Sequence, residues 1–489
     1  MGRPFTAPRP VSYAPVPDAP ALTDLAADRL PDGPRPLLST SQTLRFVGDT
    51  PRFLMLLRER YGDASAFTLR GELFIAMFAP SMVNDVLVAK QRSFVKGVGF
   101  ERMRKVLGEG LLTNEEPIHL RHRRMMQAPF HHSRLDGYAA LMADLTHHEL
   151  DRWEPDGRLL LAPAMMRLTL EIVARTLFGT GAEDDAERIG EAMDVAIDRI
   201  ERTMLPGLDR FDHARLPWFR EFGRAADELA VIAERLVSER RARADVGAID
   251  VGTAKREEDL LGLLLALRDE DGSTFSDDEV RDEALTLILS GHETTANTLT
   301  WAFSYLATHP EVRAALEREA DEQDWLGAGR SPTVEELMAA PVAGRVLNET
   351  LRLAPPVWVA PRRALVDVDV EGVHVPAGAH VIVSQYVTHR DPELFPDPEA
   401  FRPDRWQPGF ERSLPRGAYV PFGGGTRRCL GDQFALLEGR IILLAVARRF
   451  RLEPADARRP FPRAQPRATY RAKGPVPMLV RPRQAALRT

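Results

Sequence analysis

The chain has 489 residues, of which 44% are hydrophobic and 28% charged, a balance typical of a globular protein with a large buried core. Its formal net charge of -6 argues against a nucleic-acid-binding protein, because such proteins carry a basic surface. One cysteine leaves no intramolecular disulfide to form and no segment reaches the roughly 20 apolar residues of a membrane helix, so we expect a cytoplasmic protein without a membrane anchor.

The chain begins with a segment, residues 1–40, that is rich in proline, which prevents helix formation and favours an extended chain on the surface. Residues 41–489 are expected to form a single domain. From about Phe53 to Ala320, apolar residues recur at the three- and four-residue spacing of helices. Within this stretch, residues 240–259 mix charge and glycine and predict an exposed loop.

The second half of the chain predicts one long helix and one group of strands. Residues 282–309 have a long helical pattern that stops at Pro310. Between Asp367 and Val383, valines alternate around a Pro-Ala-Gly turn, which predicts strands and is the only sizeable β signal. A buried helix is expected over residues 434–446, shortly after the cysteine.

The cysteine, Cys429, lies in a loop rich in glycine and arginine; residues 422–431 read FGGGTRRCLG. A sulfur just before a helix N-terminus is favoured as a thiolate, because the helix dipole and the charges of Arg427 and Arg428 stabilise negative charge. Glycines let the backbone approach a flat ring system closely. Taken alone, however, a lone cysteine is more often a small buried hydrophobic residue beside an ordinary loop.

Two further strings indicate chemistry only in combination. In NETLRLAPP, residues 348–356, Glu349 and Arg352 share one face of a helix, which by itself usually means a solvent-facing ion pair. Residues 290–295 read SGHETT in the long helix, where a glycine costs about 1 kcal/mol relative to alanine and needs a packing or functional reason. Threonines at such positions are mostly core residues that bond back to a helix carbonyl.

Together these strings resemble the signatures of the cytochrome P-450 family. The cysteine loop matches the haem-binding signature Phe-x-x-Gly-x-Arg-x-Cys-x-Gly at its fixed positions, Phe422, Gly425, Arg427, Cys429 and Gly431. The other two strings resemble the Glu-x-x-Arg helix and the oxygen-activation motif, in which Ser290 departs from the usual Ala or Gly. FRPDRW at residues 401–406 resembles the element that supplies a second arginine, Arg405. The resemblance runs from about Phe53 to near the C-terminus.

The resemblance implies a mainly α fold with a smaller β-rich region. It places haem b (iron protoporphyrin IX) between the long central helix and the cysteine loop, with Cys429 as the axial thiolate ligand of the iron. A buried structural network is implied for Glu349, Arg352 and Arg405. Catalytic roles are implied for Glu293 and Thr294, because an acid and a hydroxyl side by side can supply the protons that oxygen activation needs.

Residues that would bind the haem carboxylates come from three places. The string EPIHLRHRR, residues 116–124, resembles a helix that holds a propionate through His119 and Arg123; many relatives have tryptophan at the position of His119, and histidine is also common there. Arg362 and Arg427 resemble the family's other propionate contacts, and Arg362 competes for this role with the arginine that follows it. For any one of these arginines alone, a solvated surface role is the default.

The implied activity is that of a haem-thiolate monooxygenase, which inserts one oxygen atom from O2 into a lipophilic small molecule such as a terpenoid, fatty acid or steroid. Candidate substrate-lining residues, carried over by position, are Phe100, Val106, Leu287, Ser290, Val357, Trp358 and Val359. Because we find no flavin, nicotinamide or cysteine-cluster motif, we expect electrons from a ferredoxin or flavodoxin with its NAD(P)H-dependent reductase.

Two alternative functions stay open at this point. A peroxide-driven peroxygenase of the same fold needs no redox partner, but such enzymes usually replace the acid and hydroxyl that this chain has in Glu293 and Thr294. A haem-based sensor would keep Cys429 and the arginines without needing that pair.

Overall fold

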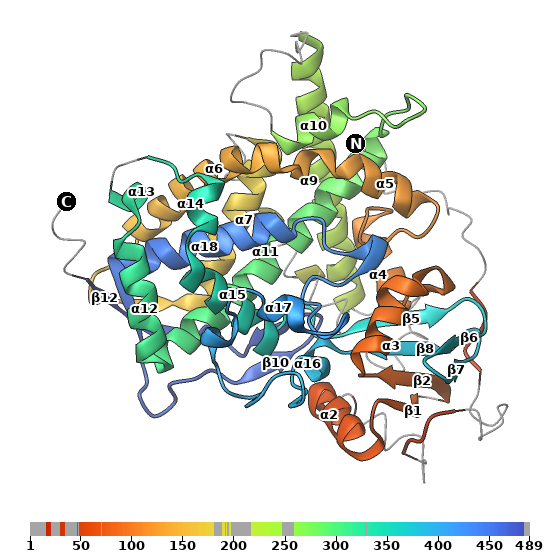
Figure 1. Ribbon diagram of the computed structural model, residues 1–489. Helices are drawn as coiled ribbons and strands as arrows, with labels where there is room; N and C mark the ends of the chain where they lie inside the picture. Colours follow the sequence, from red (N-terminus) through yellow and green to blue (C-terminus); the bar gives the residue numbers. More distant parts are fainter. Residues whose placement is uncertain are drawn as a thin grey trace.

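The computed structural model describes residues 16–20, 30–34, 46, 48–69, 71–179, 188–190, 192, 195–196, 217–246, 259–327 and 330–483. These residues form a mainly helical molecule with a smaller region of strands on one side (Figure 1). The predicted fold class is confirmed.

The long helix α11 (Asp277–Thr308) crosses the middle of the molecule (Figure 1). It begins earlier than the apolar pattern predicts, because Ser276 and Glu279 form a capping box in which each side chain accepts from the other's backbone amide. Most of its side chains are buried. Its most extensive helix contacts are with α7 (Leu161–Phe178), α9 (Pro217–Val246), α15 (Pro341–Leu353) and α18 (Asp432–Arg449).

The remaining helices lie around this centre. They are α2 (Thr50–Tyr61), α3 (Pro80–Asn84), α4 (Val98–Leu107), α5 (Ile118–Met126), α6 (His132–Asp151), α10 (Leu260–Ala266), α12 (Pro310–Asp321), α13 (Asp324–Gly327), α14 (Val334–Met338), α16 (Gln385–Thr388) and α17 (Phe410–Ser413). The largest hydrophobic core lies between α6, α7, α11, α15 and α18, and a second lies between α7, α9 and α11.

The main sheet has five strands in the order β1-β2-β8-β5-β3. They are β1 (Ala64–Leu69), β2 (Glu72–Met77), β3 (Phe94–Lys96), β5 (Ala360–Ala364) and β8 (His380–Val383). β2 and β8 are parallel, and the other neighbours are antiparallel. The strands predicted between Asp367 and Val383 are present, as Val368–Val370, Val373–Val375 and β8. Strands elsewhere gave no such signal; every residue of β1, for example, is buried, so its sequence lacks the alternation of a half-exposed strand.

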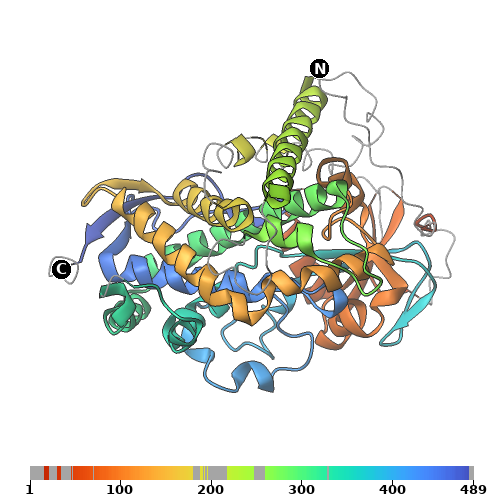
Figure 2. The ribbon, with the colours of Figure 1, turned by 90° about the horizontal axis from the view of Figure 1, so that it is seen from above.

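Smaller sheets complete the fold. β12 (Pro477–Pro482) lies between β4 (Arg158–Leu160) and β9 (Phe450–Pro454), and β4 and β12 lie side by side at the left of Figure 2. Two hairpins are formed by β6 (Val368–Val370) with β7 (Val373–Val375), and by β10 (Ala464–Pro466) with β11 (Tyr470–Ala472).

Two further expectations concern the chain's surface segments. The predicted loop at residues 240–259 was wrong at its start, because α9 continues to Val246, and residues 247–258 lie outside the described part. Described parts of the proline-rich segment contact the sheet, where the carbonyls of Pro20 and Asp32 accept from amides of β2 and β1.

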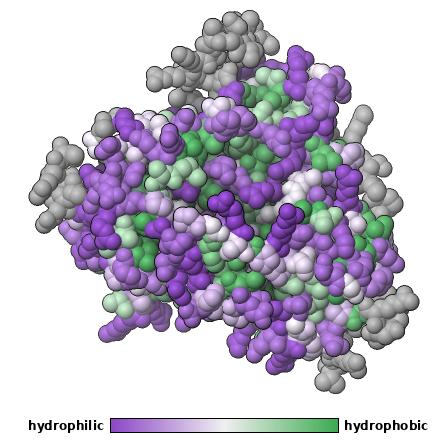
Figure 3. Space-filling model, viewed as in Figure 1, coloured by the Kyte–Doolittle hydropathy of each residue, from purple (hydrophilic) through white to green (hydrophobic). Residues whose placement is uncertain are grey.

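The face seen in Figure 3 is polar for the most part. On the face seen in Figure 3, hydrophobic residues form small separate groups among hydrophilic ones. Within the described ranges, no helix combines the length and apolar character needed to cross a membrane.

Candidate active site

The cysteine loop is held by its own backbone and by close packing. The amide of Cys429 donates to the carbonyl of Phe422 at 2.8 Å. Gly425 has a φ of 65°, and a Cβ there would lie 2.2 Å from Oε1 of Gln91, so the loop requires glycine. Gly431 directly precedes α18, which places the sulfur just before a helix N-terminus, as the string predicts.

Cys429 has an accessible side chain, yet its sulfur lies deep among protein atoms. Burial raises the pKa of the Cys429 thiol to about 11, against the opposing effects of the Gly431 amide, Arg123 and Arg428. The protein surroundings alone therefore do not favour the thiolate, because burial outweighs the helix terminus and the arginines. A metal ion at the sulfur displaces the proton of a coordinating thiol, so this donor suits a metal-containing group.

A cluster of cations lies where β3 pairs with β5. The strand register sets Lys96 directly opposite Arg362. Arg427, from the cysteine loop, reaches the same place, where it donates to the Phe94 carbonyl at 3.2 Å and binds the carboxylate of Glu115. Burial, with the nearby charge of Arg427, lowers the pKa of Arg362 to about 10, and burial lowers the pKa of Lys96 to about 7. Glu115 opposes both shifts, but positive groups outnumber it here.

Arg362 has donors left for a ligand. Within the described part of the chain, its hydrogen bond goes from Nη1 to the carbonyl of Pro361 at 2.9 Å. Arg363 points to the other side of the strand and donates to the carbonyls of Gly378 and Pro17. Arg362 is therefore the arginine that belongs to the cation cluster. Buried cations in excess of acids need anionic partners, and the two carboxylates of iron protoporphyrin IX fit that need.

His119 and Arg123 lie one turn apart on α5. His119 is buried, and burial lowers its pKa, with Lys96 and Arg427 acting in the same direction. Arg123 turns toward the cysteine loop, where Nη1 donates to the carbonyl of Arg428 at 2.5 Å. His119 thus lies near the cation cluster as a neutral imidazole, with its Nδ1 3.2 Å from Oε1 of Glu116, whereas Arg123 contacts the loop that carries the cysteine. Their roles as carboxylate contacts stay predictions.

The carboxylate of Glu349 is fully buried and accepts five hydrogen bonds, four from three side chains and one from a backbone amide. Arg352 donates from Nε and Nη2 at 2.9 and 2.8 Å, and Arg405 donates from Nε at 3.0 Å. The Trp406 indole donates at 2.8 Å, and the Arg402 amide at 2.9 Å. The structure thus brings the three predicted network residues together and adds Trp406, which the sequence did not single out.

Close helix packing explains the glycine at position 291 of the central helix. A Cβ on Gly291 would lie 2.9 Å from Cγ2 of Val173 in α7, so the glycine lets the two helices approach closely. The hydroxyl of Thr294 donates to the Ser290 carbonyl at 2.8 Å, and that of Ser290 donates to the Thr286 carbonyl at 2.7 Å. Both hydroxyls therefore bond back to their own helix.

Glu293 is 5% exposed and accepts a hydrogen bond at 2.7 Å from the hydroxyl of Thr469, in the turn before β11. Sequence reasoning missed Thr469, as it missed Lys96 and Glu115 in the cation cluster. None of them lies in a motif; strand register and a distant hairpin bring them to the site.

The structure describes the side chains of three of the four predicted substrate-lining residues on α4 and α11. Phe100 and Leu287 are partly buried. The side chain of Val106 lies outside the described residues. Ser290 is partly buried on the same helix as Leu287, with its hydroxyl bonded to the helix backbone.

The segment after α15 presents its three predicted residues differently. Val357 is 44% exposed, and Val359 packs against the core. Trp358 is buried in the core, and its indole nitrogen donates to the Arg467 carbonyl at 2.8 Å.

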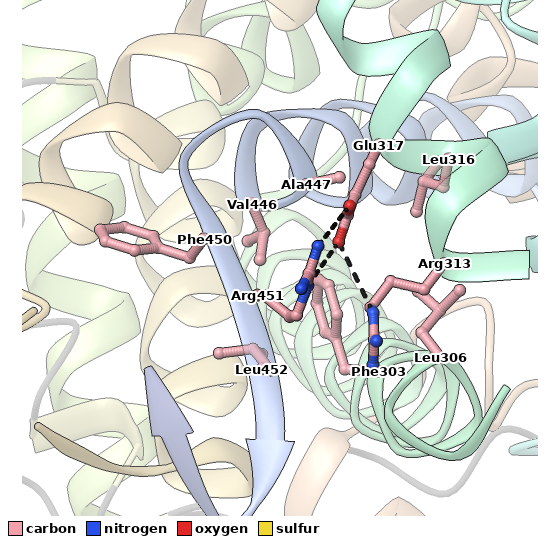
Figure 4. Close-up of a pocket in the computed structure, with 10 residues that line it drawn as sticks. All are labelled: Phe303, Leu306, Arg313, Leu316, Glu317, Val446, Ala447, Phe450, Arg451 and Leu452. Atoms are coloured by element: carbon pink, nitrogen blue, oxygen red, sulfur yellow. Dashed lines mark hydrogen bonds and ion pairs between the residues drawn. The ribbon is translucent and has the colours of Figure 1, made fainter. Parts of the chain in front are cut away.

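A separate pocket lies against the C-terminal part of α11, α12, the end of α18 and β9 (Figure 4). Arg451 donates two hydrogen bonds to Glu317, at 3.0 and 2.9 Å, and Arg313 lies 3.6 Å from the same carboxylate. Its other lining residues are apolar: Phe303, Leu306, Leu316, Val446, Ala447, Phe450 and Leu452. It contains none of the predicted site residues.

Known proteins resemble this chain in sequence and in fold. The family model described as "Cytochrome P450" matches residues 31–476. Cyclooctat-9-en-7-ol 5-monooxygenase of Streptomyces melanosporofaciens is 34% identical over 478 residues, which cover 97% of this chain and 98% of the relative. Pentalenene oxygenase of Streptomyces avermitilis is 35% identical over 421 residues, which cover 85% and 88%. The solved structure of retinoic acid bound cyanobacterial CYP120A1 superposes with a TM-score of 0.78 at 27% identity, covering 93% of this chain and 99% of that chain.

Proposed function

The chain belongs to the cytochrome P450 family, and from this premise we propose that it is a monooxygenase that inserts one oxygen atom from O2 into a lipophilic terpenoid. The observation that carries the proposal is the accessible Cys429 sulfur inside the fold, in a loop that also supplies a cation to a buried positive cluster.

In this proposal Cys429 binds the iron of haem b, and His119, Arg362 and Arg427 bind its carboxylates, with Lys96 beside them. Haem with a thiolate ligand supplies the activation of O2 and the transfer of an oxygen atom. The cations stabilise the bound carboxylates because a buried charge without a partner is costly.

Proton delivery falls to Glu293 and Thr294. Thr294 donates from Oγ1, and the neighbouring acid Glu293 supplies the proton that replaces it. An acid and a hydroxyl on adjacent residues suit this role, because a general acid acts within hydrogen-bond reach of the accepting atom or through one water.

The substrate class rests on two lines of support. Relatives are named for the oxidation of pentalenene and of cyclooctat-9-en-7-ol, both terpenoid skeletons. The residues proposed to line the site, among them Phe100, Leu287, Val357 and Val359, are apolar, so shape rather than hydrogen bonding selects the substrate.

Electrons come from a separate ferredoxin or flavodoxin with its NAD(P)H-dependent reductase. Glu293 and Thr294 support this route because the reduction of O2 takes up protons together with electrons, whereas a reaction driven by peroxide needs no electron donor. Turnover with that system should exceed turnover with hydrogen peroxide alone. The opposite ranking would favour the peroxygenase alternative.

The test begins with the purified ferric protein, titrated with terpenoids, fatty acids and steroids while the low-spin to high-spin change is followed. Terpenoids should bind most tightly, and isotope-labelled O2 should place one labelled atom in the product. Cys429→His should abolish the red-shifted Soret band of the ferrous carbonyl form. A surviving band would contradict the ligand assignment, and labelled product from no terpenoid would contradict the substrate class.

A further inference from the structure

A buried chain of hydrogen bonds leads to Glu293 from Asn297, one turn further along the same helix. Nδ2 of Asn297 donates to Oγ1 of Thr469 at 3.2 Å, and that hydroxyl donates to Oε1 of Glu293 at 2.7 Å. Their exposed fractions are 5% for Glu293, 7% for Asn297 and 8% for Thr469. Because an amide nitrogen only donates, the threonine hydroxyl accepts from Asn297 and keeps its own proton for the carboxylate.

The turn that carries Thr469 is fixed on both sides. The carbonyl of Tyr470 accepts from the indole nitrogen of Trp301 at 3.1 Å, and the carbonyl of Arg467 accepts from that of Trp358 at 2.8 Å. Both tryptophans are buried. The backbone beside Thr469 is therefore anchored to α11 and to the segment after α15, so its hydroxyl has a defined position relative to Glu293.

We propose that Thr469 is a positioning residue, whose hydroxyl holds the Glu293 carboxylate in one orientation beside Thr294, and that Asn297 sets the direction of this hydroxyl. The inference rests on the proposed function, in which Glu293 supplies protons. A short hydrogen bond to a carboxylate is strong and directional, so it restricts the acid to one rotamer. Without it, the acid no longer delivers its proton where Thr294 acts, and O2 that has taken up two electrons and two protons leaves as hydrogen peroxide instead of yielding product.

Three variants separate this role from general packing. Thr469→Val removes the hydroxyl and keeps the shape, whereas Thr469→Ser keeps the hydroxyl. Thr300→Val is the matched control, because Thr300 is also a buried threonine. Its hydroxyl differs from that of Thr469 in donating to a carbonyl of its own helix, that of Ala296 at 2.8 Å.

The first readout needs no turnover. The carboxyl stretching band of Glu293, in the carboxylate or the protonated region of the spectrum, is isolated in the resting protein as the infrared difference between each protein and its Glu293→Gln counterpart. Thr469→Val should shift this band, while Thr469→Ser and Thr300→Val should leave it in place. An unshifted band in Thr469→Val would overturn the proposal.

The second readout is the amount of product formed per nicotinamide consumed. We expect it to fall about tenfold in Thr469→Val, as for the loss of one hydrogen bond to a charged group, and to recover in Thr469→Ser. Equal losses in Thr469→Val and Thr300→Val would overturn the proposal. If the parent oxidises no terpenoid, the proposed function fails, and the infrared band alone decides on Thr469.

Asn297→Ala extends the test and stands in should Thr469→Val not fold. It removes the donor that directs the hydroxyl, so it should shift the Glu293 band in the parent and have no further effect when combined with Thr469→Val. An unshifted band in Asn297→Ala, or additive shifts in the double variant, would contradict the chain of bonds.

Discussion

The hydroxyl of Thr294 is the group on the central helix to which the proposed chemistry assigns a donated proton. Neither haem content nor substrate binding depends on that hydroxyl, so Thr294→Ala should retain both. We expect product formation to fall about a hundredfold, within the range for loss of a general acid, while hydrogen peroxide rises. Product and peroxide measured per nicotinamide consumed check this outcome.

Ser290 is the control for that experiment. Its hydroxyl donates to the Thr286 carbonyl, just as that of Thr294 donates to the Ser290 carbonyl. Ser290 differs from Thr294 in having no acidic residue next to it to resupply a proton, so we expect that it does not replace the missing group. Ser290→Ala alone should keep product formation close to that of the parent, and adding it to Thr294→Ala should change little. A double variant far worse than Thr294→Ala would mean that Ser290 substitutes as a donor.

Glu438 on α18 is a buried carboxyl whose two oxygens lack hydrogen-bond partners among the described residues. Burial raises its pKa well above the usual range; the nearby Thr295 hydroxyl opposes this shift without offsetting it, because that hydroxyl donates to the Gly291 carbonyl at 3.2 Å. The folded state thus keeps a proton that the unfolded chain releases above its ordinary pKa of 4.5, and the side chain costs stability that grows as pH rises.

Glu438→Gln should remove this cost while keeping the shape. Its advantage over the parent in free energy of unfolding should grow by up to about 1.4 kcal/mol per pH unit between about pH 5 and pH 7. Denaturant unfolding at several pH values measures it. Glu311→Gln, at an exposed position of α12, should bring no such gain.

At the scale of elements, α15 is tied to the segment after α16 by the buried carboxylate of Glu349. Glu349→Ala leaves Arg352 and Arg405 without their acid, which should cost about 3 to 5 kcal/mol and yield little haem-loaded protein. Glu399→Ala is the comparison, because its ion pair with Arg390 is exposed on the glutamate side and should be worth about 1 kcal/mol or less. Equal losses of thermal stability in the two variants would contradict the structural role of the network.

α5 is joined to α11 through His122. Burial opposes the charged imidazole, yet hydrogen bonds to Glu279 at 3.2 Å and Glu283 at 2.6 Å outweigh it and raise the pKa of His122 to about 9. The charged form therefore stabilises the fold below the ordinary pKa of 6.5, and this contribution is lost as pH rises through about 9.

His122→Gln should lower the free energy of unfolding at neutral pH by about 3 kcal/mol and should abolish the decline that the parent undergoes toward pH 9. Denaturant unfolding across that pH range measures both effects. His132→Gln, at an exposed histidine of α6, should keep the decline of the parent. A parent whose stability is flat over this range would contradict the ion pair.

At the scale of the whole molecule, features that depend on local residue spacing can be predicted from the sequence, whereas contacts between distant segments cannot. The pairing of Glu349 with Arg352 and the position of Cys429 before a helix are properties of short strings, so the sequence predicts them. β1 escapes prediction because burial on both faces removes its alternation. Lys96 and Thr469 reach the site through strand register and a distant hairpin, and no short string encodes either contact.

The position of β12 in its sheet has a consequence for synthesis of the chain. β12 is the middle strand between β4 and β9, yet it emerges from the ribosome after almost every other described element. Until then β4, whose Leu160 pairs with Pro477, has an open edge that invites non-native pairing, and closing so long a loop slows folding. Because the β4 edge stays open until β12 has been made, the nascent protein is prone to aggregation, and depends on chaperones, through most of its translation.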